Sequence, residues 1–239
     1  VGTSTISAST GTLTFGSAVT LGTLDRITFT GAGTCNFNGG FTDGAGDITV
    51  VSGTTTNMGG DYTNNGGTTI WATGSSLNFT TSLLVTATNT IAFYNVTITS
   101  GTTTMTGTIS VYGNFNINSG NSLSYSGTMA GTGTKTCTAS SGSTVTLTGT
   151  ATMPTGFASV SLNLNSTVNY NGSGTQTVAG YNYGNLTFSN SGARTLSGTI
   201  GIASTFTPGT NSCTITGSTV NFNGTGAQTV PAFNYNSLI

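Results

Sequence analysis

The sequence of 239 residues contains no histidine and no glutamate, three Lys or Arg residues and four aspartates. Charged residues make up 3% of the chain, against about 25% in an ordinary globular protein. General acid–base catalysis therefore lacks its usual side chains, and we expect no enzyme and no cofactor. Because almost no Lys or Arg is present to neutralise phosphates, nucleic acid is not an expected partner.

Long apolar runs are also missing, and cysteine is rare. No run approaches the roughly 18 residues of a membrane-spanning helix, so no membrane span is expected. The three cysteines are Cys35, Cys137 and Cys213, and each begins what reads as a strand. An odd number without CxxC spacing is neither a zinc signature nor a disulfide framework. We interpret them as small buried residues, with a bridge between Cys137 and Cys213 as the alternative.

The residues that are present favour a folded, all-β chain. The mean hydropathy is +0.11, with 34% apolar and 9% aromatic residues, whereas disordered chains combine low hydrophobicity with high charge. Thr, Ser, Asn, Gly, Val, Ile, Phe and Tyr dominate, and these residues form strands and turns. We therefore expect almost no helix.

Apolar and polar residues alternate with a period of two along most of the chain. This alternation predicts strands with one buried face. Short Gly- and Ser-containing segments such as SGT, GTG and NSG separate the strands and supply the turns. The clearest predicted strands are Thr12 to Phe15, Arg26 to Thr30, Val96 to Thr99, Thr108 to Tyr112, Asn114 to Ile117, Thr144 to Thr148 and Val160 to Leu164.

A degenerate repeat organises the second half. Ser166 to Thr187 and Ser218 to Ile239 agree at 13 of 22 positions, at a spacing of 52 residues. A unit that repeats in this way buries its apolar face against its neighbours, which indicates a solenoid. Each long unit is expected to hold two or three coils of roughly 18 to 25 residues, typical of a parallel β-helix.

Stacked coils explain the low charge. Equivalent side chains lie in register at about 4.8 Å, where like charges repel but Thr, Asn and aromatic rings hydrogen-bond or pack. We expect the rings of Asn–aromatic–Asn triplets to enter the core and the Asn residues to line a corner or an outer ladder. The predicted ladder residues are Asn169, Tyr170, Asn171, Asn221, Phe222, Asn223, Tyr183 and Tyr235.

The segments VNFNGTGAQTV, FNYNSL, FYNVTI and TLSGTI resemble the low-charge β-strand repeats of large bacterial surface and adhesin-like proteins. The resemblance covers about Phe93 to Ile239 and implies a right-handed parallel β-helix. Residues 1–70 depart from the pattern and are interpreted as divergent coils or a cap. Residues 71–239 are interpreted as a repeat solenoid that continues beyond Ile239. A β-sandwich, pilin-like subunit with a donated strand is the alternative fold.

Two kinds of ligand site are considered. Asp43 and Asp47 flank a glycine-rich loop, and Asp61 is expected near them after one coil, so calcium is a candidate ligand alongside simple solvated turns. Surface glycan is a possible partner, because six Asn-x-Ser/Thr sequons occur at Asn78, Asn95, Asn165, Asn171, Asn185 and Asn223.

These features together predict a structural role without catalysis. We expect an extracellular, cell-surface protein that forms the shaft of an adhesin or the subunit of a filament assembled by end-to-end stacking. The alternative is a binding module that uses Thr, Asn and Tyr ladders on one face to hold ice or carbohydrate.

Overall fold

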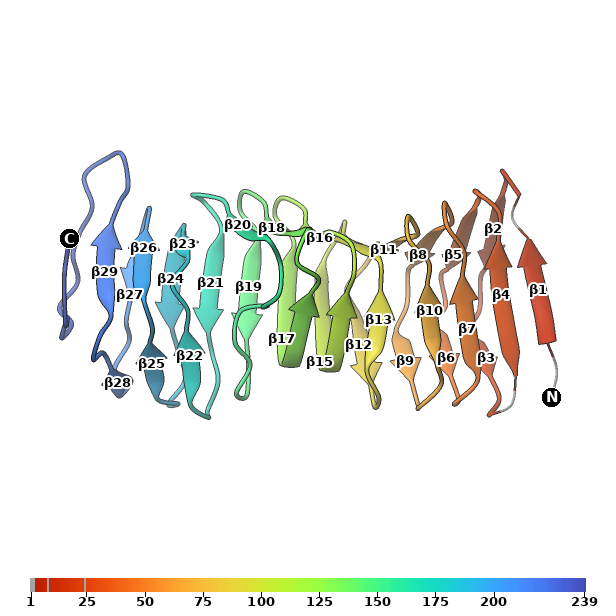
Figure 1. Ribbon diagram of the computed structural model, residues 1–239, viewed down its shortest axis with the longest axis horizontal. Helices are drawn as coiled ribbons and strands as arrows, with labels where there is room; N and C mark the ends of the chain where they lie inside the picture. The colour runs from red at the N-terminus through yellow and green to blue at the C-terminus, as the bar shows by residue number, and fades with distance from the viewer. Residues whose placement is uncertain (1–2, 8, 24) are drawn as a thin grey trace.

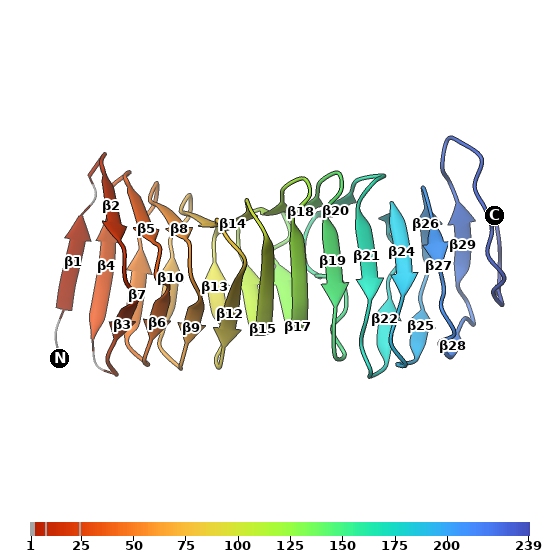
Figure 2. The same cartoon turned by 180° about the vertical axis from the view of Figure 1, so that it is seen from behind.

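A computed structural model describes residues 3–7, 9–23 and 25–239, which form a parallel β-solenoid of about 10 turns. The strand pairings in this part of the chain are all parallel, and it contains no helix. Figures 1 and 2 show an elongated coil with the two termini at opposite ends. The predicted parallel β-helix is confirmed, and the β-sandwich, whose sheets are antiparallel, is excluded.

Most turns contain three strands, one on each of three faces. The first face begins with a four-stranded sheet of β1 (Thr3–Ser7), β4 (Arg26–Thr30), β7 (Asp47–Val50) and β10 (Thr69–Trp71). The second is an eight-stranded sheet of β2 (Thr12–Phe15), β5 (Thr34–Phe37), β8 (Thr55–Met58), β11 (Ser76–Phe79), β14 (Asn95–Ile98), β16 (Phe115–Ile117), β18 (Thr136–Ala139) and β20 (Ser159–Leu162).

The third face is formed by most of an 11-stranded sheet that also reaches around one corner. It contains β3 (Val19–Leu21), β6 (Phe41–Asp43), β9 (Tyr62–Asn64), β12 (Leu83–Ala87), β13 (Ile91–Phe93), β15 (Thr102–Val111), β17 (Ser122–Gly131), β19 (Thr144–Leu147), β21 (Thr167–Tyr170), β24 (Asn185–Phe188) and β27 (Phe206–Thr207). Towards the C-terminus, two three-stranded sheets form the other faces: β22 (Gln176–Val178), β25 (Arg194–Leu196) and β28 (Cys213–Thr214), and β23 (Asn182–Tyr183), β26 (Thr199–Ile202) and β29 (Thr219–Phe222).

Strands β15 and β17 each pass around a corner without interruption. The first half of β15 pairs with β12, and its second half pairs with β13. Strand β13 joins the 11-stranded sheet through β15 but contacts β10, so it continues the first face. Gly107 and Gly127 lie in register at this corner with φ angles of 94° and 127°. A Cβ atom at either position would collide with the backbone of the preceding turn, so these corners require glycine.

The apolar residues of the alternating pattern point into the coil, and the polar residues between them point outwards. In β4, Ile27 and Phe29 are buried while Thr28 and Thr30 are partly exposed. The same pattern repeats from turn to turn, and the buried side chains form one hydrophobic cluster along the axis. Aromatic rings contact one another within it; Phe15 stacks on Phe37 with their centroids 5.0 Å apart.

Two of the three sheets cross the predicted boundary at residue 70 without a break, whereas the four-stranded sheet ends there with β10. Strand β8 pairs with β11, and β9 pairs with β12. Apart from residues 1, 2, 8 and 24, which lie outside the described part of the chain, residues 1–70 therefore form coils of the same solenoid.

Each copy of the sequence repeat forms one turn, so that its last residues pair with its first strand. In the first copy, Val168 of β21 pairs with Leu186 of β24. In the second copy, Val220 of β29 forms the equivalent parallel bridge with Leu238.

The second copy is rotated about the axis relative to the first. The first starts on β21 in the 11-stranded sheet, and the second starts on β29 in a different sheet. Each turn in this region contains three strands, and β29 is the eighth strand after β21. The spacing of 52 residues therefore corresponds to two and two-thirds turns. The copies therefore share the axis but do not lie directly above one another.

Candidate functional site

Uncharged Thr, Ser and Asn side chains cover part of the outer surface of the 11-stranded sheet. Outward side chains of β15, β17, β19, β21 and β24 lie in register in two rows, and we call this surface the hydroxyl face. One row contains Thr102, Ser122, Thr144, Thr167 and Asn185, and the other contains Thr104, Ser124, Thr146, Asn169 and Thr187. Neither row contains a charged residue.

Hydroxyl groups in the middle of this face are available for a ligand. Within the described residues, the hydroxyls of Thr104, Ser124 and Thr146 make no hydrogen bond to protein atoms, and each side chain is partly exposed. Neighbouring members of a row are about 4.8 Å apart, and the two rows, which contain alternate residues of each strand, are about 6.6 Å apart. The face therefore offers a two-dimensional lattice of hydrogen-bonding groups.

A second ladder, on the eight-stranded sheet, consists of asparagine side chains that hydrogen-bond to one another. The Nδ2 atom of Asn57 donates to Oδ1 of Asn36 at 2.9 Å, and Asn78 donates in the same way to Asn57 at 2.9 Å. Asn36 continues the row by donating to the Thr14 hydroxyl at 3.1 Å. These amides hold successive turns together, which points to a structural role for this ladder.

The predicted ladder residues of the first copy divide between inside and outside. Tyr170 and Tyr183 are buried, and their hydroxyl oxygens lie 3.0 Å apart in a hydrogen bond. Burial raises the pKa of both phenols. On the outside, the Ser189 hydroxyl lies 2.7 Å from Oδ1 of Asn169 and 3.0 Å from Oδ1 of Asn171.

The corresponding residues of the second copy are less deeply buried. The rings of Phe222 and Tyr235 pack edge to face with their centroids 6.4 Å apart. Asn223 donates from Nδ2 to Oδ1 of Asn182 at 3.0 Å, and Asn221 lies in register with Gly201 of β26. The structure therefore places the ladder residues in the repeated turns, with the aromatic rings packed against the core.

Sequence reasoning missed a buried glutamine that clamps two turns together. Gln176 is fully buried and donates from Nε2 to the carbonyl oxygens of Leu147 at 3.1 Å and Ala151 at 2.7 Å. Its Oε1 atom accepts from the Gly172 N–H at 2.9 Å. The Ala151 carbonyl and the Gly172 N–H, which have no backbone partner at this corner, are thus satisfied, as burial requires. We call this arrangement the glutamine clamp.

The second copy contains the same clamp. Gln228 donates to the carbonyl oxygens of Ile202 at 2.9 Å and Ser204 at 3.0 Å, and it accepts from the Gly224 N–H at 2.7 Å. Gln176 and Gln228 are the only two glutamines of the chain. Their shared position in the repeat, G-x-G-x-Q, was the sequence signal that could have identified them.

Arg194 was also missed, because nothing in the surrounding sequence marks it as an inward residue. It lies in register with Gln176, is fully buried, and its burial lowers the pKa of the guanidinium group. The guanidinium donates to five backbone carbonyl oxygens: those of Ser189 at 2.6 Å, Tyr170 at 2.7 Å, Gly172 at 3.1 Å, Ala193 at 3.1 Å and Gly174 at 3.5 Å. Arg194 therefore binds two backbone segments, residues 170–174 and 189–193, at one corner.

The three aspartates proposed for calcium have different surroundings. Asp43 is buried and accepts from Nδ2 of Asn64 at 2.8 Å, whereas Asp47 pairs with Arg26 at 2.9 Å. Asp61 accepts from the Leu84 N–H at 2.8 Å. Among the described residues, no group of three or more His, Cys, Asp or Glu side chains is placed to hold a metal ion. Calcium at these residues stays a prediction.

The cysteines are free thiols in the structure. Cys137 lies in β18 on the eight-stranded sheet, and Cys213 lies in β28 on another sheet, so the fold does not bring together the pair considered for a bridge. Cys35 and Cys137 are buried, whereas Cys213 is partly exposed. Burial raises the pKa of the Cys137 thiol to about 12.

Comparison with protein-family models, with curated proteins and with solved structures finds no match to this chain. A search of the described residues for a helix that is long and apolar enough to cross a membrane also finds none.

Proposed function

We propose that this chain is a segment of a rigid, extracellular shaft on a cell surface, with a structural and non-catalytic role. The observation that carries the proposal is the continuity of its sheets, since parallel pairing links the turns over almost the whole described length. Force along such a coil is shared by ladders of backbone hydrogen bonds on three faces.

Side chains that form hydrogen bonds between successive turns support the same role. The asparagine row, the glutamine clamps and Arg194 each join one turn to the next. A coil with so few ionisable groups keeps most of its stability when pH or salt changes, which suits exposure outside the cell. The resemblance of its repeats to those of bacterial surface and adhesin-like proteins is consistent with this location.

Electron microscopy of the purified protein tests the shaft proposal. With about 10 turns of about 4.8 Å each, single molecules should be rods on the order of 50 Å long. End-to-end stacking of copies, which we include in the proposal, would add filaments of the same width. Immunogold labelling of intact producing cells should place the protein on the outside. Compact particles, or label confined to the cell interior, would rule out the shaft.

A second candidate function is binding by the hydroxyl face, and the unpartnered hydroxyls of Thr104, Ser124 and Thr146 favour it. A flat, neutral lattice suits a ligand that itself repeats in two dimensions, such as ice or a crystalline polysaccharide. Thermal hysteresis measures ice binding, and retention on insoluble polysaccharide measures carbohydrate binding.

Matched variants distinguish binding by this face from non-specific adsorption. Ser124→Arg places a bulky charge in the middle of the hydroxyl face, whereas Ser110→Arg places the same charge on the outward side of β15 around the corner. We expect the first variant to lose binding and the second to keep it. Equal binding by both variants would exclude the hydroxyl face.

A further inference from the structure

The inside of the coil contains a small cavity near its N-terminal end. All three faces contribute to its walls, through β8, β9 and β10 among other strands. Its volume is about 10 Å³, which is about the space that the centre of one water molecule needs. The lining residues are apolar or aromatic, except for Thr56.

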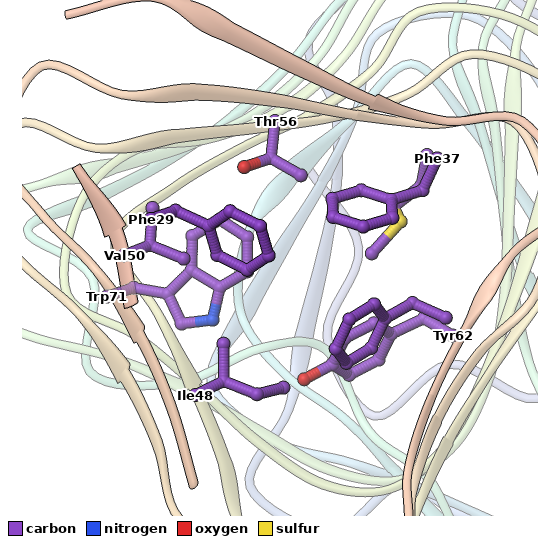
Figure 3. Close-up of a pocket in the computed structure, with 9 residues that line it drawn as sticks. Phe29, Phe37, Ile48, Val50, Thr56, Tyr62 and Trp71 are labelled. Carbon is purple, nitrogen blue, oxygen red and sulfur yellow. The ribbon is translucent and has the colours of Figure 1, made fainter. Parts of the chain in front are cut away.

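Three polar atoms in this lining have no protein partner. They are the hydroxyl of Thr56, the hydroxyl of Tyr62 and the indole N–H of Trp71. The three residues are only 2%, 1% and 7% exposed, so bulk water does not solvate these groups. In Figure 3 the Tyr62 hydroxyl and the Trp71 nitrogen project into the space beside Ile48 from two different walls. In the same view the Phe29 ring lies between the Thr56 hydroxyl and these two groups.

This arrangement is unfavourable if the three groups stay unpaired. A buried polar group without a hydrogen bond costs about 1–3 kcal/mol, and native proteins leave few such groups. Buried waters make about two to four hydrogen bonds to polar groups of this kind. The cavity has about the size for one water, and the Tyr62 hydroxyl and the Trp71 indole N–H offer it two partners.

We propose that this cavity is a binding site for a single ordered water molecule. The water accepts a hydrogen bond from the Trp71 indole N–H and exchanges a second with the Tyr62 hydroxyl. The bound water thereby links β10 on the first face to β9 on the third. An ion is not favoured, because the lining contains no charged side chain.

The single tryptophan makes the site directly observable by NMR, because its indole N–H gives one signal. In the wild-type protein we expect a nuclear Overhauser effect from water to the Trp71 indole proton. Since Trp71 is only 7% exposed, the effect should persist when exchange with bulk solvent is slowed at low temperature. Absence of the effect in the folded protein would overturn the proposal.

A substitution gives an independent test, because hydrated and dry cavities predict opposite signs for the change in folding stability. If water is bound, Tyr62→Phe removes one of its partners, and the folding equilibrium constant should fall about five-fold, as for the loss of one buried hydrogen bond. If the cavity is dry, the same change removes an unpaired hydroxyl, and stability should rise or stay the same.

Tyr170→Phe is the matched control. Its hydroxyl already bonds to Tyr183, so this variant should be destabilised whether or not the cavity is hydrated. Destabilisation of both variants supports the proposal, whereas destabilisation of Tyr170→Phe alone contradicts it. If Tyr62→Phe fails to fold, the NMR measurement on the wild-type protein decides the question.

Discussion

Asn64 donates a hydrogen bond of 2.8 Å from Nδ2 to Oδ2 of Asp43, and both side chains are fully buried where β6 and β9 pair. Burial raises the pKa of the Asp43 carboxyl and the charge of Asp47 raises it further, while hydrogen bonds from the Gly46 and Ala45 backbone and from Asn64 oppose the shift. The chain thus contains a buried carboxyl group that is most compatible with the fold when it is protonated.

Asp43→Asn should raise stability near neutral pH and change it little in acid. Because the folded-state pKa of Asp43 lies above its unfolded value, wild-type stability is highest below the unfolded pKa and falls as the pH rises through the folded pKa. The asparagine does not titrate and can form the amide–amide pair seen between Asn57 and Asn36. Urea unfolding at acid and neutral pH measures the difference.

Asp47→Asn is the control for this prediction. Asp47 pairs with Arg26 at the surface, where the two side chains are 39% and 62% exposed, so its loss should change stability by less than about 1 kcal/mol. A clear loss of stability at neutral pH in Asp43→Asn would contradict the prediction, since it would mean that the fold requires the charged carboxylate.

Gln176→Leu should destabilise the protein by about 2–4 kcal/mol, because the change leaves the Ala151 carbonyl oxygen and the Gly172 N–H unpaired and removes one of two bonds to the Leu147 carbonyl oxygen. Gln228→Leu makes the same change in a half-buried clamp, where water can replace the lost bonds, and should cost about 1 kcal/mol or less. Equilibrium unfolding of the two variants gives both values. Equal losses would show that burial does not set the strength of the clamp.

Arg194→Lys should be nearly as damaging as Arg194→Met, with a loss of about 3 kcal/mol or more in each. The guanidinium donates to carbonyl oxygens of two backbone segments, residues 170–174 and 189–193, and the three donors of an ammonium group cannot reproduce that fork. Arg26→Lys at the surface is the matched control and should be close to neutral. Wild-type stability in Arg194→Lys would mean that charge alone is needed at this corner.

The three cysteines should react with an alkylating reagent at different rates. The pKa of Cys137 is raised to about 12, and burial also raises the pKa of Cys35 and Cys213, although nearby Arg194 opposes the shift at Cys213. At neutral pH we expect slow alkylation of partly exposed Cys213 first, and alkylation of the other two only after unfolding. Mass spectrometry of unfolded, unreduced protein should show three adducts, whereas a single adduct would reveal a disulfide.

The strands could be predicted from the sequence because each depends on a local pattern. Thr12 to Phe15 and Arg26 to Thr30 were predicted from alternation, and the structure has β2 and β4 with the same bounds. Inward apolar residues and outward threonines leave little choice of register when glycine-containing turns bound the strand.

The inward polar residues could not be predicted in the same way. Gln176 and Arg194 begin β22 and β25 and occupy positions where alternation alone cannot distinguish a buried polar side chain from an exposed one. Their partners are carbonyl oxygens as far as 29 residues away in the sequence, which become neighbours only when the coil closes.

The rotation between the two copies also needed the structure. A sequence period counts residues, whereas orientation about the axis depends on how many corners those residues form. The turns differ in length, since Val145 pairs with Val168 whereas Val168 pairs with Leu186 after fewer residues.

That rotation determines how equivalent surface groups are displayed. Asn171 and Asn223 occupy the same position in the two copies, just before the glycine loops that lead to Gln176 and Gln228, but they leave the rod about one-third of a revolution apart. A third unit of the same length would carry the position to the remaining side. Sugars attached there would thus spiral around the rod, and an approaching surface would meet them from any direction.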